Sequence, residues 1–244
     1  MASTMMTIEV YLIAAKPFFV RRRRNADGLE GVLPANQART RCEPRSGRRL
    51  AGAMLPVMTG KERDDFGRIS SPFEGSLVRL RAVEEDDVAR INEGIWDPEV
   101  TEHMSIAWPE AVAQTRQFWE SIRASDSNLL LVIETIAGEF VGVVGLHGID
   151  PRNRQAELGI WIARAHWNQG YGTDAVRIAS RFGFREMNLQ RLHLHVYDTN
   201  PRGIRAYEKV GFKEEGRLRR GQFVGGRYVD VIVMGLLAED LVED

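Results

Sequence analysis

Two glycines near the middle of the chain mark the stretch best suited to chemistry with a phosphate-bearing molecule. Gly170 and Gly172 follow an apolar segment, 157–162, and stand where a helical pattern begins. Glycine lets the backbone approach a ligand closely and take dihedral angles that other residues resist. The first turn of a helix also carries free N–H groups and the positive end of the helix dipole. We therefore expect a phosphate-bearing cofactor to bind at this turn.

The spacing of these glycines fits a general cofactor motif only in part. Gly170-x-Gly172-x-x-Ala175 matches the dinucleotide-binding fingerprint, with Ala in place of the third Gly. In that fold the first glycine follows its strand almost directly, whereas here residues 163–169 intervene. The fold also repeats strand–helix–strand units, and the chain after Gly172 has room for about one. A dinucleotide-dependent oxidoreductase is therefore a remote alternative.

A second segment suited to chemistry lies at 200–212. Asn200 follows an alternating segment, 192–196, and Tyr207 comes seven residues later, which is about two helical turns. Both side chains are therefore expected on one side of a short helix, which Gly211 is suited to close.

Together, these two segments resemble the GCN5-related N-acetyltransferase (GNAT) family. Residues 167–172, WNQGYG, resemble its R/Q-x-x-G-x-G/A pyrophosphate loop, with Trp167 at the position of Arg or Gln. Residues 200–212 resemble its N-x-x-[SA]-x-x-x-Y-E-K-x-G-F element, with Gly203 at the position of Ser or Ala. The resemblance covers residues 77–240 and is closest to the branch of ribosomal-protein-alanine and spermidine/spermine acetyltransferases.

The resemblance implies a fold, a donor and a set of binding residues. The fold would be α/β (α+β), with a mixed central sheet whose central strands are splayed and flanked by helices. The donor would be acetyl-CoA, and the acetyl group would pass directly to a primary amine in a ternary complex. In the family, a bulge on the central strand frees backbone groups for the pantetheine arm and the thioester oxygen. The expected cofactor-binding residues are Ile160, Trp161, Ile162, Gln169, Gly170, Tyr171, Gly172, Thr173 and Asn200.

Two residues are expected to move protons. By the resemblance, Tyr207 would protonate the departing thiolate, and Glu157 would accept the amine proton through a water molecule. The structural alternatives are a packing role for the tyrosine and a solvated strand-edge position for the glutamate. His193 and His195 share one side of their strand, but a third ligand at suitable spacing is missing. We therefore expect structural histidines and no metal site.

The acceptor is the part of the site that the sequence determines least. We expect it to bind over the loop and helices between 95 and 122, with Glu99, Glu102 and His103 as candidate contacts. A polyamine, another small amine and a protein N-terminus all remain open. The alternative class is a non-catalytic acyl-CoA-binding regulator of the same fold, and the presence of Asn200 and Tyr207 argues against it.

The elements that must position these residues follow from the hydrophobic pattern. The predicted order is β-α-α-β-β-β-α-β-α-β-β, with antiparallel strands early, a loop between the first two helices and one parallel crossover around the glycine turn. The predicted strands are 77–81, 129–135, 140–146, 157–162, 192–196, 212–218 and 228–236. The predicted helices are 84–95, 109–122, one that starts at 173, and 204–210.

Charge and composition limit the partners. The 244 residues are 43% hydrophobic, enough for a core, and the net charge of −1 argues against a nucleic-acid binder. Residues 1–75 hold 13 Lys and Arg against 8 Asp and Glu. They show no sustained period, so we expect a disordered or non-native basic extension ahead of a domain at 76–244. Cys42 is the one cysteine, which excludes a disulfide framework, and no apolar run is long enough to span a bilayer. We expect a cytoplasmic protein with no membrane partner, and its two C-terminal strands offer a way to pair in a homodimer.

Overall fold

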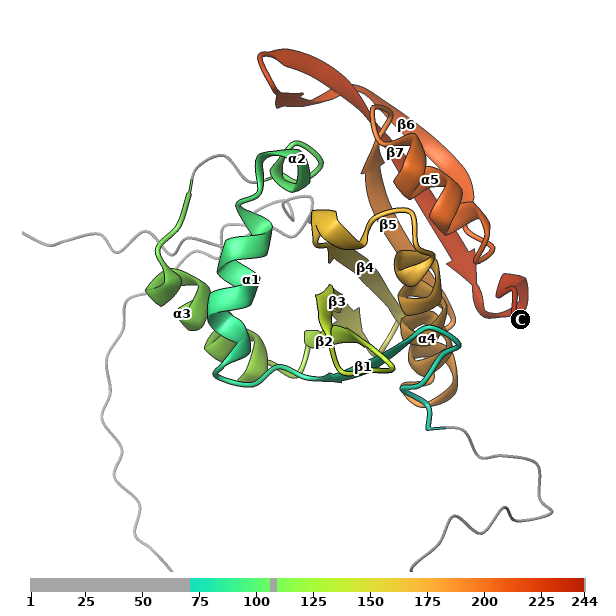
Figure 1. Cartoon of the computed structure of the whole chain (residues 1–244). Helices are drawn as coiled ribbons and strands as arrows, with labels where there is room; N and C mark the ends of the chain where they lie inside the picture. The colour runs from blue at the N-terminus through green and yellow to red at the C-terminus, as the bar shows by residue number, and fades with distance from the viewer. Residues whose placement is uncertain (1–70, 106–108, 244) are drawn as a thin grey trace, which may run out of the picture. The chain divides into compact units, whose positions relative to one another are not determined.

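The computed structural model describes residues 71–105 and 109–243, so that all but the last five residues of the extension expected at 1–75 lie outside this range (Figure 1). The strands are β1 (Val78–Ala82), β2 (Leu129–Thr135), β3 (Phe140–Asp150), β4 (Gln155–Ile162), β5 (Arg191–Tyr197), β6 (Lys213–Val224) and β7 (Arg227–Leu237). The helices are α1 (Asp87–Ile95), α2 (Pro98–Thr101), α3 (Val112–Arg123), α4 (Tyr171–Arg185) and α5 (Pro201–Glu208), with short 3₁₀ turns η1 (Arg164–His166) and η2 (Ala238–Asp240). Ahead of β1, the ring of Phe73 packs 4.7 Å from that of Phe182 on α4. No helix in the described part of the chain is long and apolar enough to cross a membrane.

Seven strands form one mixed sheet in the order β1-β2-β3-β4-β5-β7-β6. The neighbouring strands are antiparallel except for β4 and β5, which are parallel. Helix α4 connects these two strands, as a parallel pair requires. The mixed sheet with a single crossover confirms the predicted fold class, and it differs from the parallel sheet of a doubly wound dinucleotide fold.

The two central strands separate soon after they begin. β4 and β5 pair at only three positions, the last of which is Glu157↔His193. β3 stays paired with β4 along 157–162 without a register shift. The bulge that the resemblance implied on the central strand is therefore wrong for this pairing, because the gap opens through the loss of β4–β5 pairing alone. The strands are splayed as predicted, and the facing edges of β4 and β5 lack a strand partner beyond that point.

Side chains of β2 alternate between two hydrophobic cores because successive residues of a strand point to opposite faces. Leu131 and Ile133 pack in the core that includes residues of α4, whereas Leu130 and Val132 pack in the core that includes residues of α1 and α3. Figure 1 shows α1 and α3 on one side of the sheet and α4 on the other. The strand is therefore covered on both faces, which accounts for its continuous apolar run.

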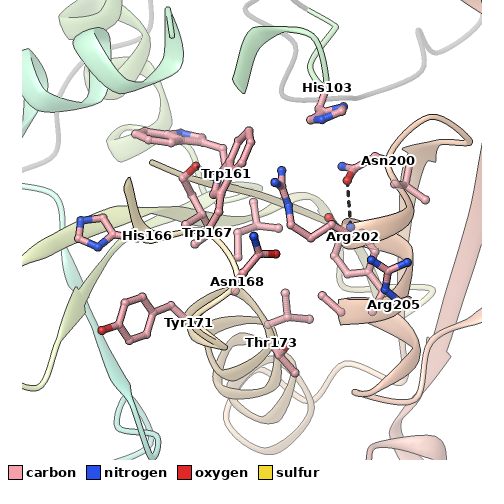
Figure 2. A pocket seen from close by; sticks show the side chains of 18 of the residues that line it. His103, Trp161, His166, Trp167, Asn168, Tyr171, Thr173, Asn200, Arg202 and Arg205 are labelled. Carbon is pink, nitrogen blue, oxygen red and sulfur yellow. Dashed lines mark hydrogen bonds between the residues drawn. The ribbon is translucent and has the colours of Figure 1, made fainter. Parts of the chain in front are cut away.

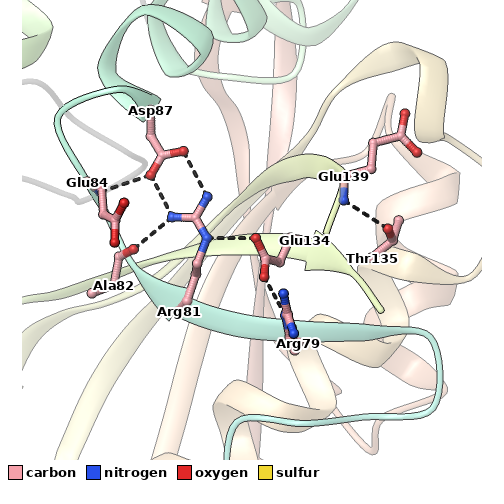
Figure 3. A network of polar contacts seen from close by, with 8 residues as sticks. All are labelled: Arg79, Arg81, Ala82, Glu84, Asp87, Glu134, Thr135 and Glu139. Carbon is pink, nitrogen blue, oxygen red and sulfur yellow. Dashed lines mark hydrogen bonds and ion pairs between the residues drawn. The ribbon is translucent and has the colours of Figure 1, made fainter. Parts of the chain in front are cut away.

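An ion-pair network fixes the start of α1 to the edge of the sheet (Figure 3). Glu134 on β2 is 5% exposed and bonds Arg79 and Arg81 of β1. Arg81 also donates to both carboxylate oxygens of Asp87, at 2.6 and 2.9 Å. Asp87 in turn accepts from the backbone N–H of Glu84 at 2.9 Å. The N–H groups of Asp87 and Val88 donate to carbonyls three residues back, at 3.0 and 3.2 Å, so residues 84–86 form a tighter turn and α1 begins at Asp87, not at 84 as the sequence predicted.

Polar side chains cap two short helices, α2 and α5, whose presence or start differs from the predictions. The segment that contains α2 was expected to be a loop. Asp97 caps it by accepting from the N–H of Glu99 at 2.9 Å, and a proline occupies its first turn. Helix α5 begins at 201 instead of 204, because Asn200 caps it by accepting from the N–H of Gly203. In both cases a short polar side chain satisfies a backbone donor that the hydrophobic pattern does not register.

Candidate active site

A cavity of about 320 Å³ opens where β4 and β5 separate (Figure 2). Its walls come from the ends of β4 and β5, the start of α4, and α5, and the segment after α2 contributes His103. Within the described ranges no aspartate or glutamate lines it, whereas Arg202, Arg205 and Lys209 do. These three cations recur at helical spacing along α5 and its C-cap, Lys209. The cavity therefore suits an anionic ligand.

The first turn of α4 faces this cavity with free backbone donors. Gly170 is the N-cap with a φ of 85°, and Asn168 before it also has a positive φ, of 62°. The N–H groups of residues 171–173 have no acceptor within the helix, and the helix dipole adds positive potential. Asp174 lies in the same turn, but its carboxylate accepts from two backbone N–H groups at the start of β1, at 2.7 and 3.0 Å. This turn suits a pyrophosphate.

Trp167 joins two elements across the opening of the cavity. Its indole Nε1 donates to the carbonyl of Ile162 at the end of β4, at 2.7 Å. The guanidinium carbon of Arg202, at the start of α5, lies 3.4 Å from the centroid of an indole ring. This stacking is a cation–π contact. Trp167, the residue at which the loop departs from the family pattern, thus contacts the end of β4 and the start of α5.

Asn200 lines the cavity from the N-terminus of α5. Its Oδ1 accepts from the N–H of Gly203 at 2.9 Å, so its amide nitrogen is the part of the side chain left to donate to a ligand. A Cβ at residue 203 would lie 2.8 Å from that nitrogen. Glycine at 203, the second departure from the family pattern, therefore leaves the carboxamide in place.

The other predicted cofactor-binding residues come together here, with one exception. Ile160, Trp161, Ile162, Gly170, Tyr171, Gly172 and Thr173 line the cavity. Gln169 does not line it; its side chain is exposed, and its Nε2 donates to the carbonyl of Ala165 at 3.0 Å. The glycine turn is thus presented to the cavity by its backbone, and the glutamine side chain faces away from it.

Tyr207 lines the cavity from α5 and is half-buried. Its ring packs edge-on against Phe212, with centroids 5.9 Å apart. Burial raises the pKa of its phenol to about 12. The hydroxyl therefore stays protonated at neutral pH and can donate a proton, whereas a role as a base would need the lowered pKa that this environment opposes.

Glu157 lies beneath the cavity surface. It is 8% exposed, does not line the cavity, and places its Oε1 2.8 Å from Nδ1 of His195. His195 itself lines the cavity. From the sequence we expected His195 to be a structural histidine, because the alternation of a strand does not indicate a contact with a carboxylate on another strand. No group of three or more His, Cys, Asp or Glu side chains in the described part of the chain is placed to hold a metal ion.

The residues predicted to contact the acceptor divide into one inside the cavity and two outside it. His103 lines the cavity, and burial together with the nearby charge of Arg202 lowers its pKa. Glu99 forms a 2.6 Å ion pair with Arg164, and Glu102 is exposed. Neither glutamate lines the cavity.

A mixed sheet that splays beside a glycine-capped helix, with a cation-lined cavity in the gap, defines a CoA-dependent acyltransferase. The chain matches the profile described as "Acetyltransferase (GNAT) domain" over residues 78–213, and it belongs to that family. It is an N-acetyltransferase that uses acetyl-CoA as its donor. Neither alternative class, the non-catalytic regulator or the dinucleotide-dependent oxidoreductase, finds support among its relatives.

Three known proteins show how far the similarity extends. The chain is 31% identical over 167 residues to the uncharacterized N-acetyltransferase p20 of Bacillus licheniformis, which covers 67% of this chain and 94% of the relative. It is 29% identical over 162 residues to the spermidine N(1)-acetyltransferase of Vibrio cholerae, and this alignment covers 66% of this chain and 94% of the relative. The crystal structure of spermidine N-acetyltransferase from Vibrio cholerae in complex with CoA and spermine matches with a TM-score of 0.64 and 28% identity, and covers 67% and 96%.

Proposed function

We propose that the acceptor of this N-acetyltransferase is a small primary amine of the polyamine class, acetylated directly in a ternary complex. The observation that carries this proposal is the similarity, along almost their whole length, to spermidine acetyltransferases. One cavity reaches from the first turn of α4 to His103 after α2. A donor and an acceptor that share one cavity have no need of a covalent enzyme intermediate.

The residues of the cavity divide the work between binding and proton transfer. The backbone N–H groups of 171–173 hold the pyrophosphate, and the amide of Asn200 and the edge of β4 along 160–162 hold the pantetheine arm. Acetyl-CoA supplies an activated acyl group and a thiol leaving group. Tyr207 donates the proton that the leaving sulfur needs, since burial keeps its phenol protonated. Glu157 acts on the proton that the amine loses. It does so through His195, the side chain that lies between Glu157 and the cavity.

The charge beside α2 favours an acceptor with a second amino group. Glu102 is exposed and forms no ion pair with any other described residue, whereas the charge of Glu99 is balanced by Arg164. A polyamine that places one amine in the cavity can place its next cation near Glu102. A protein N-terminus gains nothing from this carboxylate unless its second residue is basic.

Release of free CoA thiol with a panel of acceptors tests this proposal. The protein should turn over spermidine and spermine, and a peptide with an N-terminal alanine should give little release. The variant Glu102→Gln should raise KM for spermidine about two- to fivefold, the range of an exposed ion pair of ~0.5–1 kcal/mol. Glu186→Gln, an exposed carboxylate at the end of α4, is the matched control. Turnover of the peptide without turnover of polyamines would overturn the acceptor assignment and leave the acetyltransferase standing.

The β6–β7 hairpin is the part of the described chain we propose for a homodimer contact. It turns at Gly225 and Gly226 and carries Phe223 and Tyr228 with 58% and 64% of their surface exposed. Exposed aromatic side chains of this size favour a partner surface. Analytical ultracentrifugation should show a dimer that dissociates when both aromatic residues are replaced by serine, and a monomeric wild-type protein would dismiss the contact.

A further inference from the structure

The last paired position of the two central strands places a histidine at the base of the cavity. Glu157 on β4 pairs with His193 on β5, and beyond this pair the strands separate. His195 lies two residues further along β5, on the same side as His193 and just past the last pairing. It therefore sits where the gap begins, where it lines the cavity while its Nδ1 still reaches Glu157 at 2.8 Å.

This hydrogen bond fixes the chemistry of the imidazole. A carboxylate accepts only, so in the neutral ring Nδ1 carries the proton and Nε2 carries the lone pair. His195 makes no other hydrogen bond to the described residues. Glu157, by contrast, has one oxygen committed to the ring and no direct place in the cavity wall.

We propose that His195 Nε2 takes the proton from the attacking amine, and that Glu157 is a positioning residue that holds the imidazole in this tautomer. The proposal rests on the proposed function, namely transfer to an amine. As the amine nitrogen bonds to the thioester carbon, the carbon–sulfur bond breaks and one proton leaves the nitrogen for Nε2. Tyr207 supplies the proton that the sulfur gains. The imidazolium then loses its proton to water and the phenolate regains one, so that both side chains return to their starting state.

The titratable groups on the strands beside His195 carry little positive charge, whereas the cations of the cavity, Arg202, Arg205 and Lys209, come from α5 and its C-cap. His147 on β3 pairs with Glu157, and burial lowers the pKa of His147 despite that carboxylate. Burial likewise lowers the pKa of His193, whose ring centroid is 6.2 Å from that of His195. Burial therefore favours the neutral form of both neighbours. Further along β5, Arg191 is neutralised by its ion pair with Glu215 of β6. The imidazolium formed in the step has Glu157 as its closest charged partner.

Chemical rescue separates a base from a structural histidine. In His195→Ala the space of the ring joins the cavity, so free imidazole can enter and accept the proton. We expect kcat with spermidine to fall at least about 100-fold, the lower end for loss of a general base, and added imidazole to restore part of it. Calorimetry should give an unchanged Kd for acetyl-CoA. Glu157→Gln should cost less than His195→Ala, and the double variant should cost no more than His195→Ala, since the two act as one unit.

Matched variants guard against a trivial loss of folding. His193→Gln alters the neighbouring imidazole on the same strand face, outside the cavity wall, and should keep wild-type kcat. His195→Gln keeps the size of the side chain if the alanine variant does not fold, and its kcat should fall in the same way. Full activity of a folded His195 variant overturns the proposal. So does a loss that imidazole does not rescue when Glu157→Gln loses as much, because Glu157 would then act directly. A wild-type protein that acetylates the N-terminal peptide but not spermidine counts against the acceptor class alone, and the same variants are then assayed with the peptide.

Discussion

Replacing Tyr207 by phenylalanine removes the hydroxyl that faces the cavity and keeps the ring that packs on Phe212. The structure predicts a loss in kcat with little change in acetyl-CoA affinity. The ring supplies the packing against Phe212 at 5.9 Å, so the fold of α5 should survive. The hydroxyl supplies a proton that is needed only when the sulfur departs, and interactions made only in the transition state appear in kcat.

The size of the loss follows from the environment of the phenol. Burial raises the pKa of Tyr207 from 10 to about 12, which disfavours the phenolate by about 3 kcal/mol. The thiol that would receive the proton has an ordinary pKa of about 8.5. Complete proton transfer from Tyr207 to the thiolate is therefore unfavourable by about 5 kcal/mol. The proton is therefore only partly transferred when the carbon–sulfur bond breaks. General acids contribute about 10²–10⁴-fold, and a weak acid belongs at the lower end, so we expect a loss of about 100-fold in kcat.

Thiol release at saturating acetyl-CoA and spermidine measures this loss, and calorimetry measures acetyl-CoA binding. Tyr228→Phe, the same change at a side chain that is 64% exposed on β7, is the control. Because the phenol stays protonated up to about its pKa of 12, wild-type kcat should show no decline between pH 8 and 10 that follows its ionisation. A Tyr207→Phe protein with kcat within about twofold of wild type would remove the hydroxyl from the mechanism.

Two further predictions concern the glycine turn and the ion-pair network. Gly170→Val should weaken acetyl-CoA binding at least about tenfold in calorimetry, because a β-branched residue resists a φ of 85° at a cost above about 1–2 kcal/mol. Unchanged affinity would refute the role of this turn in phosphate binding. The control is Gly216→Val, where the added Cβ meets open space. Glu134→Gln should lower the free energy of unfolding in urea by about 1–3 kcal/mol, since Arg79 and Arg81 each lose a hydrogen bond to a carboxylate and only Arg81 keeps a second charged partner, Asp87. Burial raises the pKa of Glu134, but hydrogen bonds from Arg81 and Arg79 outweigh it and lower the pKa, so its stabilisation is present above its unfolded pKa and is lost as pH falls through the folded value. The acid unfolding of Glu134→Gln should therefore be less steep than that of wild type, and identical curves would contradict the role of the network.

The order of the strands and most of the residues that line the cavity could be predicted because they depend on local patterns. The glycine pair, the helix after it and the strand before it are close in sequence, and glycine at a helix start has a direct physical meaning. The same holds for Asn200 and Tyr207, which lie two helical turns apart on one short helix. Strand number and the single crossover follow from runs of apolar residues whose period is visible in the sequence.

The features that could not be predicted are contacts between elements far apart in the chain. Glu157 was expected to face the reaction, yet the position at which β4 and β5 stop pairing determines that His195 stands between it and the cavity. Likewise, nothing local to Gln169 indicates that its amide turns to the carbonyl of Ala165. The row of basic residues at α5 could have been predicted, because Arg202, Arg205 and Lys209 follow helical spacing. It was missed because the family motif in this segment consists of Asn200 and Tyr207.

Two contacts, one between β4 and β5 and one between the end of β4 and α5, explain why the cavity has a defined width. At the closed end, Glu157 on the β4 side bonds His195 on the β5 side. At the open end, Trp167 is tied to the end of β4 through its Nε1, and Arg202 from α5 stacks on its ring. Strands that have lost their ladder have no hydrogen bonds of their own to fix their separation. Cross-gap side-chain contacts take over that task, and one of them is made by the tryptophan that departs from the family's loop pattern. The departure therefore replaces a polar side chain with one that links the end of β4 to α5, and it leaves the backbone donors of residues 171–173 free for the phosphates.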